Sequence, residues 1–289
     1  MTTLLGAGVG IGDLFSQPFM RNAFLAGVPI AALAGLLGYF MVLRKQVFVG
    51  DALSHVAFSG AVGALAFGID ARLGLFVGTV VVAGGLGVLG RKGRADDVVV
   101  GTVFAWVLGL GVLALSIYTA SAKAASNGAV GATVLFGSIF GLSASQARTA
   151  AVVAVLLLLV VLAIVRPLLF ASLDEAVAAA RGVPVRALGV GFLVLVGAIA
   201  AEATQAVGAL LLLGLLAAPA GAAVRLTHRP YVALGLASAL SVVAMVVGLV
   251  ASYLLPKVPP SFAIIAVASA GYALTFLVSW RPASHGDGR

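Results

Sequence analysis

The sequence is dominated by long apolar runs that recur along its whole length and are separated by short polar or glycine-rich connections. An α-helix needs about 20 consecutive, mainly apolar residues to cross the hydrocarbon core of a bilayer. Of the 289 residues, 62% are hydrophobic and 9% are charged, whereas an average soluble domain carries about 25% charged residues. We therefore predict a single all-α, polytopic membrane domain over residues 1–289, with no separate soluble domain.

Nine segments are long and apolar enough to be membrane spans. They are residues 24–43, 51–68, 73–89, 98–116, 149–165, 188–201, 206–224, 232–254 and 262–280. The stretch 188–224 is too long for one crossing, and its only interruption is at Glu202–Gln205. We divide it there into two spans; without that division the chain would have eight. The pattern Gly74-xxx-Gly78 predicts close packing between helices.

The basic residues indicate how the chain is oriented in the membrane. If the N-terminus lies outside and the C-terminus in the cytoplasm, every predicted cytoplasmic connection carries Lys or Arg, as the positive-inside rule requires. These residues are Arg44, Lys45, Arg91, Lys92, Arg94, Arg166, Arg181, Arg186, Arg225, Arg229, Arg281 and Arg289. Orientation in a lipid bilayer thus explains the net charge of +8, and we expect no nucleic-acid partner. The tail 282–289 is predicted to be disordered.

Asp51 and His55 are the strongest candidates for chemistry. The chain has no cysteine, so metal ligands must come from His, Asp, Glu and other oxygen donors. The i, i+4 spacing places a carboxylate and an imidazole on one helix face, and such a pair suits first-row divalent metals. A second copy of the pair from another subunit would complete four-coordination. On spacing alone, a capping Asp51 with His55 bonded to a neighbouring carbonyl explains the pair equally well.

Glu202 and Gln205 are weaker candidates for a transport pathway. Glu202 follows fourteen apolar residues, about 21 Å of helix, and could therefore lie below the outer surface. The alternative, a solvated turn acid, is favoured by the polar neighbours that follow it.

The predicted cytoplasmic connection 167–187 contains a short amphipathic helix around Asp174 and Glu175 that ends at Gly182 and Pro184. Ser172 is suited to cap this helix, and the two acids favour its N-terminus.

No motif indicates that the chain is an enzyme. Residues 85–90 imitate a phosphate-binding loop, but Arg91 and Lys92 follow where Lys-Ser/Thr is required. We therefore expect any ATP hydrolysis to belong to a separate subunit.

The segment Gly50-Asp-Ala-Leu-Ser-His55 closely resembles the signature of the metal-type ABC transporter permeases, the zinc and manganese import family. Four further segments resemble that family in the same order. They are residues 17–27, 97–104, 135–141 and 205–223, the last with Gly221 and Ala222 where the family more often has Ala and Thr.

The resemblance implies a homodimeric permease in the bacterial cytoplasmic membrane. Its partners would be cytoplasmic ATP-binding cassette subunits and an extracytoplasmic metal-binding protein. The metal-pathway residues would be Asp51 and His55, and the cation would be transported, with no permanently bound cofactor. From the ligands themselves we expect zinc first, because of the imidazole, and manganese next, because a carboxylate suits it equally. The ATPase-coupling residues would be Ser172, Asp174, Glu175, Ala178 and Gly182.

Two rival functions stay open from the sequence. One is an ABC permease for a metal chelate such as haem, cobalamin or a siderophore, in which Asp51 and His55 are structural. The other is an ATP-independent secondary transporter with Glu202 as proton relay.

Overall fold

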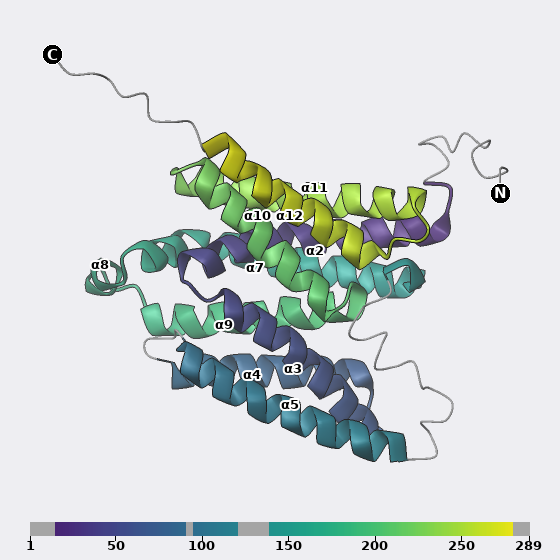
Figure 1. The fold of residues 1–289 in the computed structure, drawn as a ribbon. Helices are drawn as coiled ribbons and strands as arrows, with labels where there is room; N and C mark the ends of the chain where they lie inside the picture. The colour runs from purple at the N-terminus through teal and green to yellow at the C-terminus, as the bar shows by residue number, and fades with distance from the viewer. Residues whose placement is uncertain (1–14, 91–94, 121–138, 280–289) are drawn as a thin grey trace.

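The computed structural model describes residues 15–90, 95–120 and 139–279, and these form a bundle of long helices (Figure 1). Within them no strand is found, which confirms the predicted all-α class. The long helices are α2 (Pro18–Leu43), α3 (Val47–Ala66), α4 (Ala71–Leu89), α5 (Asp97–Ala120), α7 (Ala144–Leu173), α9 (Val185–Ala206), α10 (Ala209–Leu226), α11 (Pro230–Leu254) and α12 (Pro260–Ser279). Two short elements, η2 (Ile139–Gly141) and α8 (Glu175–Ala180), lie between long helices.

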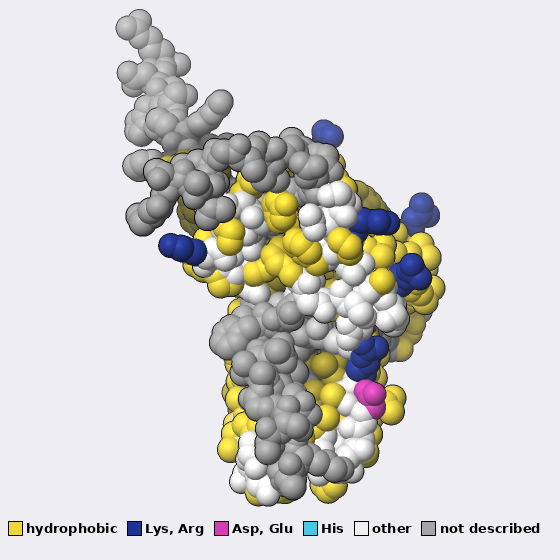
Figure 2. Space-filling view, turned by 90° about the vertical axis from the view of Figure 1, so that its right-hand side faces the viewer, with side chains coloured by type: hydrophobic (Ala, Val, Ile, Leu, Met, Phe, Trp, Pro, Cys, Tyr) yellow, Lys and Arg dark blue, Asp and Glu magenta, His cyan; other side chains and the backbone are white. Residues whose placement is uncertain are grey.

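The helices run side by side in two groups joined by α7 and α9 (Figure 1). Helices α10 and α11 pack on α2 and are covered by α12, while α3, α4 and α5 form the other group. Helix α2 also contacts α7 and α9, and most of its residues are buried. Helices α5 and α12 lie at the edges and expose large apolar side chains such as Trp106 and Leu277, as lipid-facing helices do. Figure 2 shows the end of the bundle where α2 begins. On this face, Lys and Arg side chains lie around the outline, next to hydrophobic side chains.

All nine predicted spans fall on helices. Eight helices of the described chain are long and apolar enough to cross a membrane, and the shorter apolar helix Leu211–Leu226, within α10, lies where the remaining span was predicted. The division of 188–224 is confirmed, because α9 ends at Ala206 and α10 begins at Ala209. The orientation stays a prediction. Residues 282–289, the predicted disordered tail, lie outside the described residues.

The break between α9 and α10 depends on Gly208. The amide N–H groups of Val207 and Gly208 both donate to the Ala203 carbonyl, which closes α9. Gly208 then has φ 92° and ψ 154°, a backbone region that residues with a Cβ essentially do not enter. A glycine is therefore required for the chain to turn directly from one span into the next.

We expect Gly208→Ala to destabilise the protein by about 1–3 kcal/mol, the usual cost of forcing a Cβ into such a conformation. Thermal unfolding of the purified protein in detergent would measure this as a lower midpoint. Gly235→Ala in α11 is the matched control, because a Cβ at Gly235 meets no atom within 4 Å. Equal midpoints for the two variants would contradict this account of the break.

Close packing between α3 and α4 depends on two facing glycines. A Cβ on Gly60 of α3 would overlap the Gly74 carbonyl of α4, and a Cβ on Gly74 would overlap the Gly60 carbonyl. Gly78, one turn beyond Gly74, also lies against Gly60. The small-residue pattern in α4 therefore lets the two backbones touch and fixes α4 against α3, the helix that carries Asp51 and His55.

Candidate functional site

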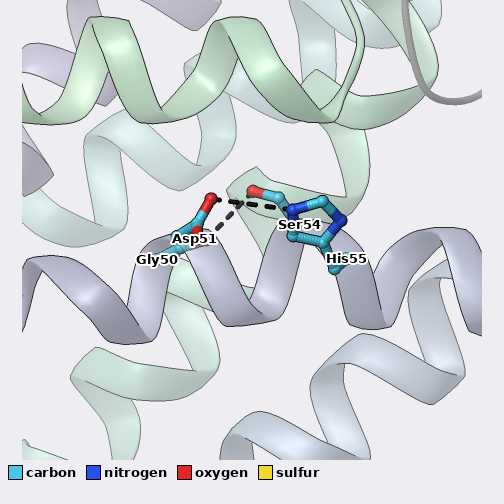
Figure 3. A network of polar contacts seen from close by, with 4 residues as sticks. All are labelled: Gly50, Asp51, Ser54 and His55. Carbon is cyan, nitrogen blue, oxygen red and sulfur yellow. Dashed lines mark hydrogen bonds and ion pairs between the residues drawn. The ribbon is translucent and has the colours of Figure 1, made fainter. Parts of the chain in front are cut away.

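Asp51 and His55 lie inside α3, in its second and third turns, with their side chains on the same face (Figure 3). The distance from Asp51 Oδ1 to His55 Nε2 is 3.8 Å, too long for a hydrogen bond, and each side chain is 25% exposed. The carboxylate oxygen and the ring nitrogen are therefore close enough to approach one ion without being closed onto each other. The predicted juxtaposition of the two side chains is confirmed.

The structure contradicts the alternative of a capping Asp51 with a carbonyl-bonded His55. Helix α3 begins at Val47 with Gln46 at its N-cap, so Asp51 does not cap it. In the described part of the chain, the His55 side chain contacts Asp51 and the ring of Phe104, and it makes no hydrogen bond to a carbonyl.

The surroundings of the pair are apolar on the side of α5. The rings of His55 and Phe104 lie 5.6 Å apart, and Phe48 contacts Phe104 edge-on at 6.1 Å. The Ser54 hydroxyl is buried and donates to the Gly50 carbonyl at 2.9 Å, so its proton is committed to the helix (Figure 3). Because aromatic rings replace water around part of the pair, attraction between the carboxylate and a cation is stronger than it would be in solution.

One chain supplies an incomplete metal site. Across the described residues, no group of three or more His, Asp or Glu side chains is placed to hold a metal ion. A stable zinc site usually has four ligands, and a catalytic one has at least three protein ligands. The pair in a single chain is therefore suited to a transient contact or to half of a shared site.

Glu202 lies within α9 and is only 3% exposed, so the interpretation as a solvated turn acid is wrong. The apolar run of α9 simply continues through Glu202 to Ala206. Its neighbour Ala201 packs with Ala57 and Ala61 of α3, which places Glu202 beyond His55 along that helix. A carboxylate at this depth is costly unless it has a function or a compensating partner.

Gln205 joins α9 to α4 rather than to the Asp51/His55 pair. With its amide oxygen turned toward Arg72, Gln205 accepts N–H groups from that guanidinium, one of them at 3.2 Å from Nη2. A possible pathway role for Glu202 and Gln205 stays a prediction.

The connection 167–187 differs from the prediction at its start. Helix α7 continues through Pro167 to Leu173, and its 30 residues span about 45 Å against about 30 Å of hydrocarbon. The short helix is α8, and its N-cap is Asp174, whose Oδ1 accepts from the Val177 amide at 2.9 Å. Ser172 is therefore not the cap, because it still belongs to α7 and its hydroxyl donates to the Leu168 carbonyl at 2.6 Å.

Helix α8 projects from one end of the bundle (Figure 1). Ala178 anchors it with 0% exposure, and Gly182 follows it with φ 80°, while Asp174 is exposed. A cleft of about 1010 Å³ lies beside it, lined by the end of α4, by α8 and by the start of α9, including Glu175 and Arg186. The sequence had not revealed this cleft, because its walls come from three separate segments.

The Asp174 side chain caps the N-terminus of α8. We therefore expect Asp174→Ala to weaken this helix by about 1 kcal/mol. Hydrogen–deuterium exchange of the amides in 177–181 would then be about fivefold faster, since 1.4 kcal/mol is a factor of ten. Asp174→Ser keeps a capping oxygen and should exchange at nearly the original rate. Unchanged exchange in Asp174→Ala would contradict the capping role.

A bundle of membrane-spanning helices with a carboxylate and an imidazole side by side inside one span is typical of a membrane transport protein. The chain belongs to the ABC 3 transport family, whose sequence profile matches residues 16–279. It is thus a permease subunit for metal import and a multi-pass plasma-membrane protein.

Named relatives support this assignment along most of the chain. The manganese transport system membrane protein MntC of Halalkalibacterium halodurans is 27% identical over 268 residues, covering 92% of this chain and 89% of MntC. The chelated iron transport system membrane protein YfeD of Yersinia pestis is 30% identical over 244 residues, covering 84% of this chain and 80% of YfeD. The solved structure of PsaBC from Streptococcus pneumoniae in complex with Fab matches with a TM-score of 0.77 at 26% identity, covering 92% of this chain and 94% of that one.

Proposed function

We propose that this chain is the membrane subunit of an ATP-driven importer of a divalent metal ion, and that Asp51 and His55 contact the ion as it passes. The observation that carries the proposal is the position of the pair. A carboxylate and an imidazole lie 3.8 Å apart and partly exposed on one face of an apolar span. Ionisable groups inside a membrane are expensive, and such groups typically mark an ion pathway.

The chemistry of the pair supports a first-row divalent cation. A carboxylate oxygen suits manganese, and an imidazole nitrogen suits zinc and iron as well. Among the relatives, MntC is named for manganese and YfeD for chelated iron. We therefore place manganese ahead of zinc for this chain, which reverses the order expected from the ligands alone.

A homodimer fits the incomplete site. Two copies would bring two carboxylates and two imidazoles together, which is enough to replace most of the hydration shell of an ion. Two ligands from each chain also allow the ion to leave, because conduction requires binding that is favourable enough for entry and weak enough for release. In this arrangement a metal-binding protein delivers the cation outside, and the ion passes between the two α3 helices.

The cytoplasmic partner would be a pair of ATP-binding cassette subunits that dock at α8. This segment projects from the bundle and has a cleft beside it, as a docking element requires. Closure of the ATPase pair on ATP would move α8 and so change which side of the membrane the Asp51/His55 pair faces. The chain itself hydrolyses nothing in this scheme.

Two rival functions each retain one supporting observation. The name of YfeD refers to chelated iron, so a chelate remains the second candidate for the cargo. The 3% exposure of Glu202 inside a span favours a proton-linked role for that residue over a solvated one. Uptake that continues without any ATPase partner would establish the secondary transporter instead.

The test uses the permease with its ATPase and binding protein, reconstituted in vesicles and supplied with Mn²⁺, Zn²⁺ or an iron chelate. We expect Asp51→Asn and His55→Gln each to lower metal uptake by about tenfold or more, since losing 1.4 kcal/mol of ion contact is a factor of ten. Ser54→Ala is the matched control between them, because the Ser54 hydroxyl donates to the Gly50 carbonyl of its own helix.

Three results would count against parts of the proposal. Normal uptake of every cation by both variants would remove the pair from the pathway. Uptake of the chelate without competition from free metal would make the chelate the cargo. Equal transport of zinc and manganese would show that selectivity does not reside in this subunit.

A further inference from the structure

We infer that Arg44 is a positioning residue that transmits movement of α8 to α3, and so to Asp51 and His55. The inference rests on the proposed function, because it assumes that an ATPase acts on α8. It concerns how one end of the bundle is connected to the ion-binding helix.

Arg44 is a buried cation rather than a solvated one. Its residue exposure is 5%, although it directly follows the last residue of α2. A cation that only fixed membrane orientation would not need to leave water, since the positive-inside rule concerns charge in the connection and not its contacts. Burying a guanidinium is costly unless it makes specific bonds.

The first of these bonds reaches the end of α7. Arg44 Nε donates to Ser172 Oγ at 2.9 Å, and the contact is buried between residues 128 positions apart in the chain. Ser172 in turn donates to the Leu168 carbonyl, which fixes its hydroxyl on α7. Only Leu173 separates Ser172 from Asp174, the N-cap of α8.

The second contact of Arg44 is with α9, the helix that follows α8 in the chain. The Arg44 guanidinium lies over the Phe192 ring at 4.9 Å from its centroid, and Phe192 is fully buried. Phe192 also contacts Phe40 of α2 edge-on at 6.2 Å. Helix α7 precedes α8 in the chain and α9 follows it. The Arg44 side chain therefore contacts both helices that flank α8.

The corner after Arg44 is stiff. Gln46 N–H donates to the Met41 carbonyl at 2.8 Å and Lys45 N–H to the Val42 carbonyl at 3.1 Å, the two bonds of a Schellman motif. Lys45 adopts φ 57°, a left-handed conformation that is usually taken by glycine. Helix α3 begins at Val47, immediately after this motif. Because the two hydrogen bonds fix the connection, a displacement of Arg44 would also displace the start of α3.

An arginine suits this position better than a lysine. A planar guanidinium can donate to Ser172 while its face lies on the Phe192 ring, whereas an ammonium is a point charge without a stacking face. Arg44→Lys therefore keeps the positive charge at this end of the bundle but loses the paired geometry.

The experiment uses the complete transporter in vesicles, with ATP hydrolysis and Mn²⁺ uptake measured on the same preparation. We expect Arg44→Met, Arg44→Lys and Ser172→Ala to lower the number of ions moved per ATP by about fivefold or more, with metal-stimulated hydrolysis within about twofold of the original. A fivefold fall corresponds to about 1 kcal/mol, which is about the net contribution of one hydrogen bond. Because Arg44→Lys keeps the charge, it separates the effect of geometry from that of charge.

Two further variants distinguish transmission from damage to the fold. Arg225→Met is the matched control, since Arg225 lies over the Phe276 ring in a cation–π contact between α10 and α12, away from α8. It should leave the number of ions per ATP unchanged. The double variant Arg44→Met/Ser172→Ala should be no worse than Arg44→Met alone, because both changes break the same contact.

The inference is overturned if uptake and hydrolysis fall in the same proportion, if both stay unchanged, or if the two substitutions act additively. Should Arg44→Met fail to assemble, Ser172→Ala decides alone, since it removes the acceptor and leaves the guanidinium in place. A wild-type transporter that moves no metal with ATP would overturn the proposed function and this inference together. Normal wild-type transport with unaltered variants would overturn the inference only.

Discussion

The need to bond every backbone N–H and C=O inside hydrocarbon governs this structure. Helices meet that need within themselves, so function has to be built from side chains on helix faces. Ser54 and Thr79 satisfy their hydroxyl groups locally, by donating to the carbonyls of Gly50 and Leu75, each four residues earlier. A carboxylate cannot donate to its own helix in this way. In the proposed function the Asp51 carboxylate and the His55 ring contact the cation, whereas the Ser54 hydroxyl between them is bonded to its own helix.

The spans were predictable because each needs its own run of about 20 mainly apolar residues. Such a run consists of consecutive residues and can be found without knowing the fold. The division within 188–224 was also predictable, although its cause was misplaced. The polar residues at 202–205 suggested the break, whereas the structure turns at Gly208 and keeps Glu202 inside α9. Helical periodicity placed Asp51 and His55 together because i, i+4 neighbours share a face in any α-helix.

What the sequence could not predict depends on partners distant in the chain. Arg44 is one basic residue among many at helix ends, and nothing local shows that it is buried against Ser172 and Phe192. Ser172 looked like a cap because a serine near a helix start commonly is one. The structure gives that role to Asp174, because α7 does not stop at Pro167. A proline inside a helix is tolerated in membranes when neighbouring groups compensate for the lost hydrogen bond.

Helix α7 is longer than the hydrocarbon core and leads directly into α8. Its length of 30 residues leaves about 15 Å of rod once a hydrocarbon core of about 30 Å has been crossed. Pro167 lies in the last third of α7, and its ring nitrogen has no N–H to donate to the carbonyl four residues earlier. A helix of about 45 Å equals the thickness of a bilayer with its headgroups, so α7 is long enough to carry α8 to the membrane surface. A partner that binds α8 can therefore act on the bundle from that surface without entering the hydrocarbon.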